Sequence, residues 1–140
     1  MRILAVDLGL ARTGLAISDE TEFLASPVCT LNERRLDRLC EKIAAIAVEQ
    51  KAAMIVVGHP KNMDGTCGES AQRAEQFAED LKVATGLPVV LWDERMTTVT
   101  AISYLNETDV RGKKRKAVVD TVAATVILQD YLEYRRLHRE

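Results

Sequence analysis

Short unbroken runs of apolar residues recur along the chain and predict the strands of a sheet. Four runs are continuous rather than alternating: Ile3 to Val6, Leu15 to Ile17, Ala53 to Gly58 and Val89 to Trp92. A continuous run is typical of a strand that is buried on both faces, so we expect helices on either side of the sheet. A fifth strand is predicted over Glu22 to Thr30, where Pro27 favours an edge or bulged position.

Apolar residues at helical spacing predict four helices between and after these strands. The first runs from Asn32, its capping residue, to about Gln50, and the others cover Glu69 to about Thr85, Thr97 to about Asn106, and about Ala117 to Arg139. The order of elements predicts an α/β fold with a mixed five-stranded sheet, in which antiparallel strands come first and parallel strands follow. At 140 residues, we expect residues 1–140 to form one domain.

Acidic residues follow two of the buried runs. Asp7 ends the first run before a glycine-bracketed hairpin, and Asp93 and Glu94 come after the last. A carboxylate at the end of a central strand is partly desolvated, which is costly unless a cation or hydrogen-bond donors meet it. Neighbouring residues in a strand face apart, so we expect only one of Asp93 and Glu94 to reach the site, and of the two we expect Glu94. The alternative roles are turn capping into Gly9 for Asp7 and pairing with Arg95 for Glu94.

Asp120 lies near the predicted start of the last helix, on a face that is otherwise apolar. That face also carries the residues three, four, seven and eleven positions further on, which are Ala123, Ala124, Ile127 and Tyr131. We therefore expect its carboxylate to lie toward the sheet. The helix dipole would offset only about 0.3 to 1 kcal/mol of the several kcal/mol of desolvation. The alternative is an N-terminal acid that serves the dipole alone.

Asp7, Glu94 and Asp120 are thus predicted to occupy comparable places around the sheet. Three acids brought together repel one another, and divalent cations would remove that repulsion, because carboxylate oxygens are ligands for hard ions. A pair of Mg²⁺ or Mn²⁺ ions can activate a water and stabilise the leaving oxygen in phosphodiester hydrolysis. We therefore predict that these three acids are both catalytic residues and metal ligands.

Positive charge is concentrated toward the end of the chain. Residues 1–110 hold 11 Lys/Arg against 17 Asp/Glu, a balance of −6, whereas residues 111–140 hold 8 against 4, a balance of +4. Five basic residues surround Gly112 and predict an exposed loop: Arg111, Lys113, Lys114, Arg115 and Lys116. We expect this loop to bind a nucleic-acid backbone, helped by Arg12, Lys61 and Asn62. A purely solvated loop is the alternative.

Cysteine usage and apolar run length bear on the compartment. Cys29, Cys40 and Cys67 are odd in number and widely spaced, so we expect free thiols in a reducing cytoplasm rather than a disulfide framework or a zinc site. No apolar run approaches the roughly 20 residues of a membrane span, and the stretch before Asp7 is too short for a signal peptide. We expect a cytoplasmic protein with no membrane partner.

Four motifs follow one another along almost the whole chain: Val6 to Gly9 with Arg12 to Gly14, Val57 to Thr66, Asp93 to Thr98, and Val119 to Ala124 with Ile127 to Leu132. Together they resemble the YqgF, or RuvX, family. The resemblance implies a fold similar to ribonuclease H and to the RuvC Holliday-junction resolvase. It also implies a metal-dependent nuclease that matures the 5′ end of precursor 16S ribosomal RNA. Members of the family were earlier proposed to resolve Holliday junctions.

Carried over by position, the family's acids fall on Asp7, Glu94 and Asp120. His59 stands where the family more often has an aliphatic residue, and we expect it to be a hydrogen-bonded loop residue rather than a metal ligand. Phe23, Phe77 and Trp92 fall in predicted core elements, which disfavours a base-stacking platform and favours recognition of backbone and shape. The resemblance implies pre-rRNA as the preferred partner, with ribosomal association as a further expectation.

Two alternatives to an rRNA nuclease remain open, and a third is disfavoured by the length of the chain. A resolvase of four-way DNA junctions must cut two strands symmetrically, which favours a homodimer, so both a monomer and a homodimer remain open. An ATP-dependent kinase or chaperone of the actin-like superfamily opens with a similar strand, acid and glycine hairpin, but requires two such domains. A non-catalytic RNA-binding factor would use the basic residues and need no metal.

Overall fold

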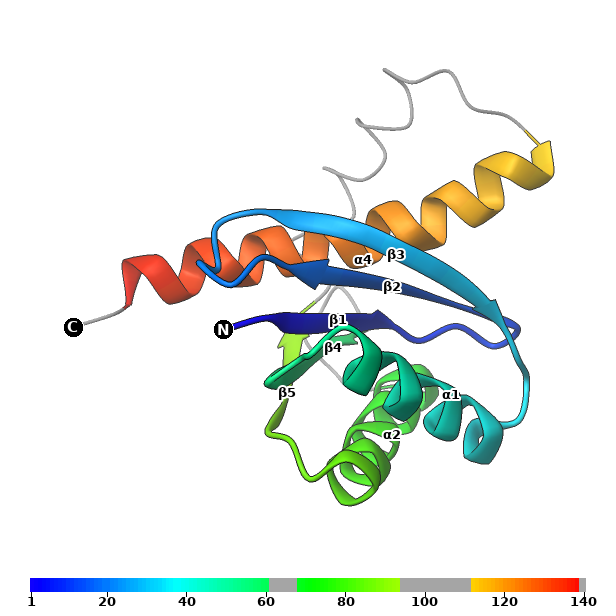
Figure 1. The fold of residues 1–140 in the computed structure, drawn as a ribbon. Helices are drawn as coiled ribbons and strands as arrows, with labels where there is room; N and C mark the ends of the chain where they lie inside the picture. The colour runs from blue at the N-terminus through cyan, green and yellow to red at the C-terminus, as the bar shows by residue number, and fades with distance from the viewer. Residues whose placement is uncertain (61–67, 94–111, 139–140) are drawn as a thin grey trace.

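A mixed sheet of five strands forms the centre of the molecule (Figure 1). The computed structural model describes residues 1–60, 68–93 and 112–138, with 112–121 as backbone only. The strands are β1 (Ile3–Asp7), β2 (Arg12–Ser18), β3 (Ala25–Asn32), β4 (Met54–His59) and β5 (Val89–Asp93), in the order β3-β2-β1-β4-β5. β1 pairs with β2 antiparallel and with β4 parallel, and β4 pairs with β5 parallel. The predicted sheet is confirmed, with β1 in its middle.

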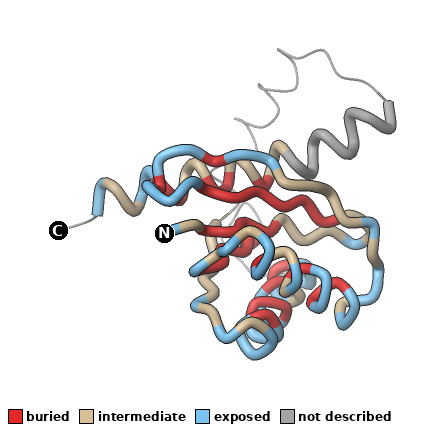
Figure 2. Tube along the Cα trace, in the orientation of Figure 1, coloured by how far each residue is buried: buried red, intermediate tan, exposed pale blue. Residues whose placement is uncertain are grey.

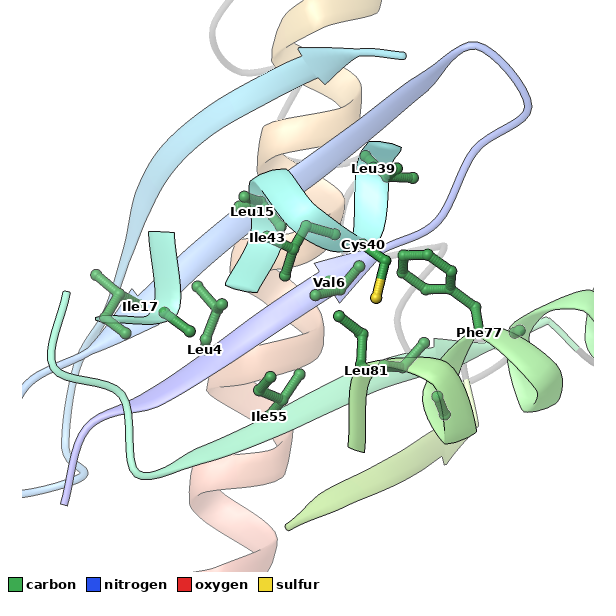
Figure 3. Close-up of a cluster of buried hydrophobic side chains, with 14 residues drawn as sticks. Leu4, Val6, Leu15, Ile17, Leu39, Cys40, Ile43, Ile55, Phe77 and Leu81 are labelled. Carbon is green, nitrogen blue, oxygen red and sulfur yellow. The ribbon is translucent and has the colours of Figure 1, made fainter. Parts of the chain in front are cut away.

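Helices cover both faces of this sheet. α1 (Leu36–Glu49) and α2 (Glu69–Thr85) pack on one face, and α4 (Gly112–Leu137) crosses the other. Alternate residues of β1 enter the two layers: Leu4 and Val6 pack toward α1 and α2, as Figure 3 shows, whereas Ile3 and Ala5 pack toward α4. Burial on both faces explains why the β1 run is continuously apolar (Figure 2).

The edge strand β3 confirms one expectation and corrects two. Its pairing with β2 shifts register beside Pro27, so the predicted edge position and bulge are present. Asn32 is wrong as a helix cap, because it ends β3 opposite Arg12, and α1 begins only at Leu36. Phe23 is wrong as a core residue: it precedes β3 and is 62% exposed, with the Arg136 guanidinium 4.7 Å from its ring centre.

The last helix begins earlier than its apolar pattern predicts. α4 starts at Gly112 rather than about Ala117, and ends at Leu137 rather than Arg139. Four of the residues predicted to form a basic loop are therefore helical: Lys113, Lys114, Arg115 and Lys116. Lys and Arg are good helix formers, and like charges one turn apart cost only about 0.2 to 0.5 kcal/mol per pair, so charge alone did not prevent the helix. Arg111 and the helix predicted over Thr97 to Asn106 lie outside the described residues.

Two of the three cysteines lie in the described part of the chain. Cys29 and Cys40 are free, and burial raises the pKa of both thiols, which keeps them protonated at neutral pH. Cys67 lies outside the described residues. None of the helices in the described part of the chain is both long and apolar enough to cross a membrane.

A buried carboxylate ties the chain's first residue to the end of α4. Glu22 is 7% exposed, and its two oxygens lie 3.2 Å from the Met1 amino group and 2.6 Å from Arg135 Nε. Gln129, also in α4, bonds to the backbone of the same turn at Phe23 and Ala25. These contacts hold α4 across the β2–β3 hairpin, and so help to fix its position over the sheet.

Replacing Glu22 by glutamine should lower the free energy of unfolding by about 1 to 3 kcal/mol, because two cationic groups would lose the carboxylate between them. Glu20→Gln is the matched control, since the Glu20 side chain is exposed and only its carbonyl contacts the Met1 amino group. Urea unfolding of the two variants beside the wild type measures the difference. Equal midpoints for Glu22→Gln and Glu20→Gln would contradict this role.

Candidate active site

Three adjacent parallel strands end at the same edge of the sheet, and each ends on a polar residue. Asp7 ends β1, His59 ends β4 and Asp93 ends β5. The registers align these ends, since Val6 pairs with Val57 and His59 pairs with Asp93. In open α/β sheets, ligands bind outside the carboxyl ends of the strands. This edge is therefore the candidate site.

Asp7 and Arg12 face the α4 side of this edge. Ile3, Ala5 and Ala16 belong to the layer beneath α4. Strand alternation places Asp7 on the same side of β1 as Ile3 and Ala5, and Arg12 on the same side of β2 as Ala16. The two strands are paired there, with Asp7 opposite Gly14. Both side chains are half-buried. The structure therefore brings one predicted catalytic acid and one predicted phosphate contact to the same face.

His59 faces the opposite side of the sheet. It follows Ile55 and Val57, which pack toward α1 and α2, and it is 7% exposed. Its Nε2 lies 3.4 Å from Glu75 Oε1 in α2, within ion-pair distance when the ring is protonated but not aligned as a hydrogen bond. The prediction of a loop position is wrong, because the β4 ladder extends through His59. The side chains of His59 and Asp7 therefore lie on opposite faces of the sheet.

The alternation of β5 bears on the choice between Asp93 and Glu94. Val90 and Trp92 pack in the layer beneath α4, whereas Val89 packs in the other layer. Asp93 therefore continues the face of Val89. Glu94 comes two positions after Trp92, and it lies outside the described residues. The expectation that Glu94 serves the site stays a prediction.

Asp120 belongs to the helix that covers the Asp7 face of the sheet. Ala124 and Leu128 of α4 are fully buried against that face, and Asp120 comes one helical turn before Ala124. The alternative role as a helix N-terminal acid is wrong, because α4 begins at Gly112 and has no acid in its first turn. The side chain of Asp120 is outside the described part, so its role as a ligand stays a prediction.

Only part of the predicted site is described as side chains. Across residues 1–60, 68–93 and 122–138, no group of three or more His, Cys, Asp and Glu residues could hold a metal ion. Asp7 is the one predicted metal ligand whose side chain lies in this part. Among the predicted nucleic-acid contacts, Lys61 and Asn62 lie outside it, and only Arg12 is described with its side chain.

The turn that follows Asp7 is held by contacts from two elements. Arg73 of α2 donates a hydrogen bond from its terminal guanidinium nitrogen to the Gly9 carbonyl at 2.6 Å. The Gly9 amide lies 3.4 Å from the hydroxyl of Thr13, which is fully buried in β2. A Cβ on Gly9 would lie 2.0 Å from the Arg12 carbonyl oxygen, so the turn admits only glycine in this shape.

Arg73 is the residue in this region that sequence reasoning missed. It lies between Ala71 and Ala74, two inward positions of α2, yet a single arginine on an amphipathic helix looks like part of the solvated face. Its partner is 64 residues away in the sequence. No local sequence pattern predicts a contact between residues so far apart in the chain.

The chain is similar to known proteins along almost its whole length. A family model described as RuvX, Holliday junction resolvase, matches residues 1–134. A protein from Geobacillus thermodenitrificans is 46% identical over 138 residues, which cover 97% of this chain and 100% of that protein. One from Lachnospira eligens is 44% identical over 139 residues, covering 97% and 99%. Both carry the name "Putative pre-16S rRNA nuclease".

Solved structures of resolvases share the fold. Thermus thermophilus RuvC in complex with a Holliday junction substrate has a TM-score of 0.61 at 14% identity, covering 99% of this chain and 96% of that chain. Fowlpox virus resolvase in complex with junction DNA has a TM-score of 0.55 at 12% identity, covering 99% and 100%. The predicted ribonuclease H-like architecture is confirmed by this likeness.

Proposed function

The chain belongs to the RuvX family and is a nuclease, and from this premise we propose that it is a metal-dependent phosphodiesterase that processes pre-16S rRNA. The observation that carries the proposal is the place of Asp7, at the carboxyl end of the central strand and on the face covered by α4. A carboxylate there can hold a cation beside a bound nucleic-acid strand. We propose that residues 1–140 act as a single catalytic domain.

The proposed metal ligands are Asp7, Glu94 and Asp120. Three facts support this set: Asp7 lies on the α4 face, Glu94 comes two positions after Trp92 in the sequence and Trp92 packs beneath α4, and position 120 is one turn before the buried Ala124. Three carboxylates suit Mg²⁺ or Mn²⁺, which take oxygen ligands. When bound, a pair of such ions supplies the activation of water and the stabilisation of the leaving oxygen.

The protein's own contribution is to orient the acids and to hold the strand. Asp7 is half-buried at the end of β1, and the pairing of β1 with β2 holds its backbone in place. Arg12, on the same face, is proposed to neutralise a phosphate next to the scissile bond. Six further basic residues and one amide are proposed contacts along the nucleic-acid backbone: Lys61, Arg111, Lys113, Lys114, Arg115, Lys116 and Asn62.

Two substrates are consistent with the fold, and the comparisons favour RNA. The relatives that are named for pre-16S rRNA share 44% and 46% identity with the chain, whereas the resolvases bound to junction DNA share 12% and 14%. We therefore propose precursor rRNA as the substrate, in the cytoplasm and in association with ribosomal particles. The second candidate is a four-way DNA junction, for which a homodimer would place two sites about a two-fold axis.

Cleavage of two labelled substrates side by side tests this proposal. A pre-16S rRNA 5′ leader and a mobile four-way DNA junction are incubated with the protein and Mg²⁺ or Mn²⁺, with Asp7→Asn as the inactive control. We expect metal-dependent cutting of the RNA and not of the junction. Symmetric cutting of the junction would instead favour a resolvase. Binding of RNA without any cleavage above the Asp7→Asn level would favour a non-catalytic RNA-binding factor.

A further inference from the structure

We infer that Arg73 is a positioning residue for Asp7, an inference that rests on the proposed nuclease function. Its guanidinium holds the turn between β1 and β2, and so fixes the backbone directly after the strand end that carries the Asp7 carboxylate. Arg73 makes a short hydrogen bond to this turn, from the side of the sheet opposite to Asp7, and Leu10 at the tip of the turn is exposed.

The hydrogen bond is short and charge-assisted. Arg73 donates to the Gly9 carbonyl oxygen at 2.6 Å, and Gly9 is two residues after Asp7. A donor that carries a positive charge makes a stronger hydrogen bond than a neutral one. The amide of the same glycine lies 3.4 Å from Thr13 Oγ1, so both backbone polar groups of Gly9 have a partner.

The contact comes from the side of the sheet opposite to the one Asp7 faces. Ala74 and Phe77 of α2 pack in the layer that also contains Leu4 and Val6, whereas Asp7 continues the α4 face of β1. Arg73 therefore contacts the backbone of the turn from the α2 side of the sheet, which is opposite to the face of Asp7. This geometry gives it a role in orienting the turn rather than in touching substrate or metal.

Leu10 lies at the tip of this turn. Leu10 is 75% exposed, so it contributes little hydrophobic packing there. Gly9 adds no side chain, and its close approach to the Arg12 carbonyl makes the turn tight. A tight turn with an exposed tip depends on polar contacts for its order. Arg73 supplies one of these and thereby links α2 to the strand end that carries the acid.

Two variants and one control test the inference. Arg73→Ala removes the donor, Arg73→Lys keeps the charge with a different reach, and Arg38→Ala changes an exposed arginine of α1 in the same chemical way. The first readout is hydrogen–deuterium exchange of residues 8–12 without metal or substrate. The second is Mn²⁺ binding followed by electron paramagnetic resonance, and the third is kcat and KM for the cleaved substrate.

We expect faster exchange over residues 8–12 in Arg73→Ala, weaker Mn²⁺ binding, and a kcat lowered by about tenfold to a hundredfold with KM within about twofold. Arg73→Lys should fall between wild type and Arg73→Ala, and provides the comparison if the alanine variant does not fold. Exchange and kcat equal to those of Arg38→Ala would overturn the inference, even if the melting temperature fell.

Failure of this inference is distinguishable from failure of the proposed function. A wild-type protein that neither binds Mn²⁺ nor cleaves nucleic acid would overturn the proposed function, and with it the role of Arg73 toward a catalytic acid. A wild-type protein that does both, while Arg73→Ala exchanges and cleaves as the control does, would overturn the positioning role alone.

Discussion

An Asp7→Asn variant should fold like the wild type and lose about 10³-fold or more in metal-dependent cleavage. Metal ions contribute several kcal/mol of transition-state stabilisation in phosphodiester hydrolysis, and each 1.36 kcal/mol corresponds to about tenfold in rate. Asparagine has almost the shape of aspartate but no negative charge, so a half-buried position at the end of β1 accommodates it. The loss should therefore concern metal binding and not the fold.

Thermal unfolding with and without Mn²⁺ separates these two effects. Wild type should melt at higher temperature as Mn²⁺ is added, because a ligand that binds the folded state stabilises it, by about 2.7 kcal/mol at a hundred times its Kd. Asp7→Asn should lose most of that rise. Asp37→Asn is the matched control, since Asp37 is 64% exposed in α1 and pairs with Arg35. Cleavage by Asp7→Asn within tenfold of wild type would contradict the metal-ligand role.

The strands and the inward faces of two helices were predictable because burial leaves a direct pattern in the sequence. Ile3 to Val6 are buried on both sides of the sheet, so the run is continuous and identifies β1 as a central strand. In α2, the buried residues recur at the helical spacing from which this helix was predicted: Ala71, Ala74, Phe77, Ala78 and Leu81. The position of Asp7 at the end of β1 follows from the same pattern.

Features that depend on tertiary contacts, or on a balance between opposing local preferences of the chain, were not predictable in this way. Asn32 is a good capping residue, but pairing with β2 draws it into β3. The basic run before Ala117 looks like a loop when only its charge is considered, yet helix propensity prevails there. The contact of Arg73 with Gly9 depends on where α2 packs, and no periodicity of the helix encodes it.

A Gly9→Ala variant should combine a loss of stability with a severe loss of activity. The added Cβ would lie 2.0 Å from the Arg12 carbonyl oxygen and 3.1 Å from the Arg12 carbonyl carbon, which are backbone atoms that cannot rotate away. The turn must therefore move, and the hydrogen bond from Arg73 must lengthen or break. Overpacking of this kind costs about 1 to 3 kcal/mol. Displacement of the turn after Asp7 should lower kcat by about a hundredfold.

A Gly86→Ala variant distinguishes a loss of activity caused by lower stability from one caused by displacement of the turn after Asp7. Gly86 caps α2 with φ of 70°, and nothing lies within 4 Å of an added Cβ, so alanine there suffers backbone strain but no clash. That strain costs about 1 to 2 kcal/mol, comparable to the cost at Gly9. Urea unfolding should show both variants destabilised, whereas cleavage should fall only in Gly9→Ala. Similar activities in two equally destabilised variants would show that the shape of the turn beyond Asp7 does not control the reaction.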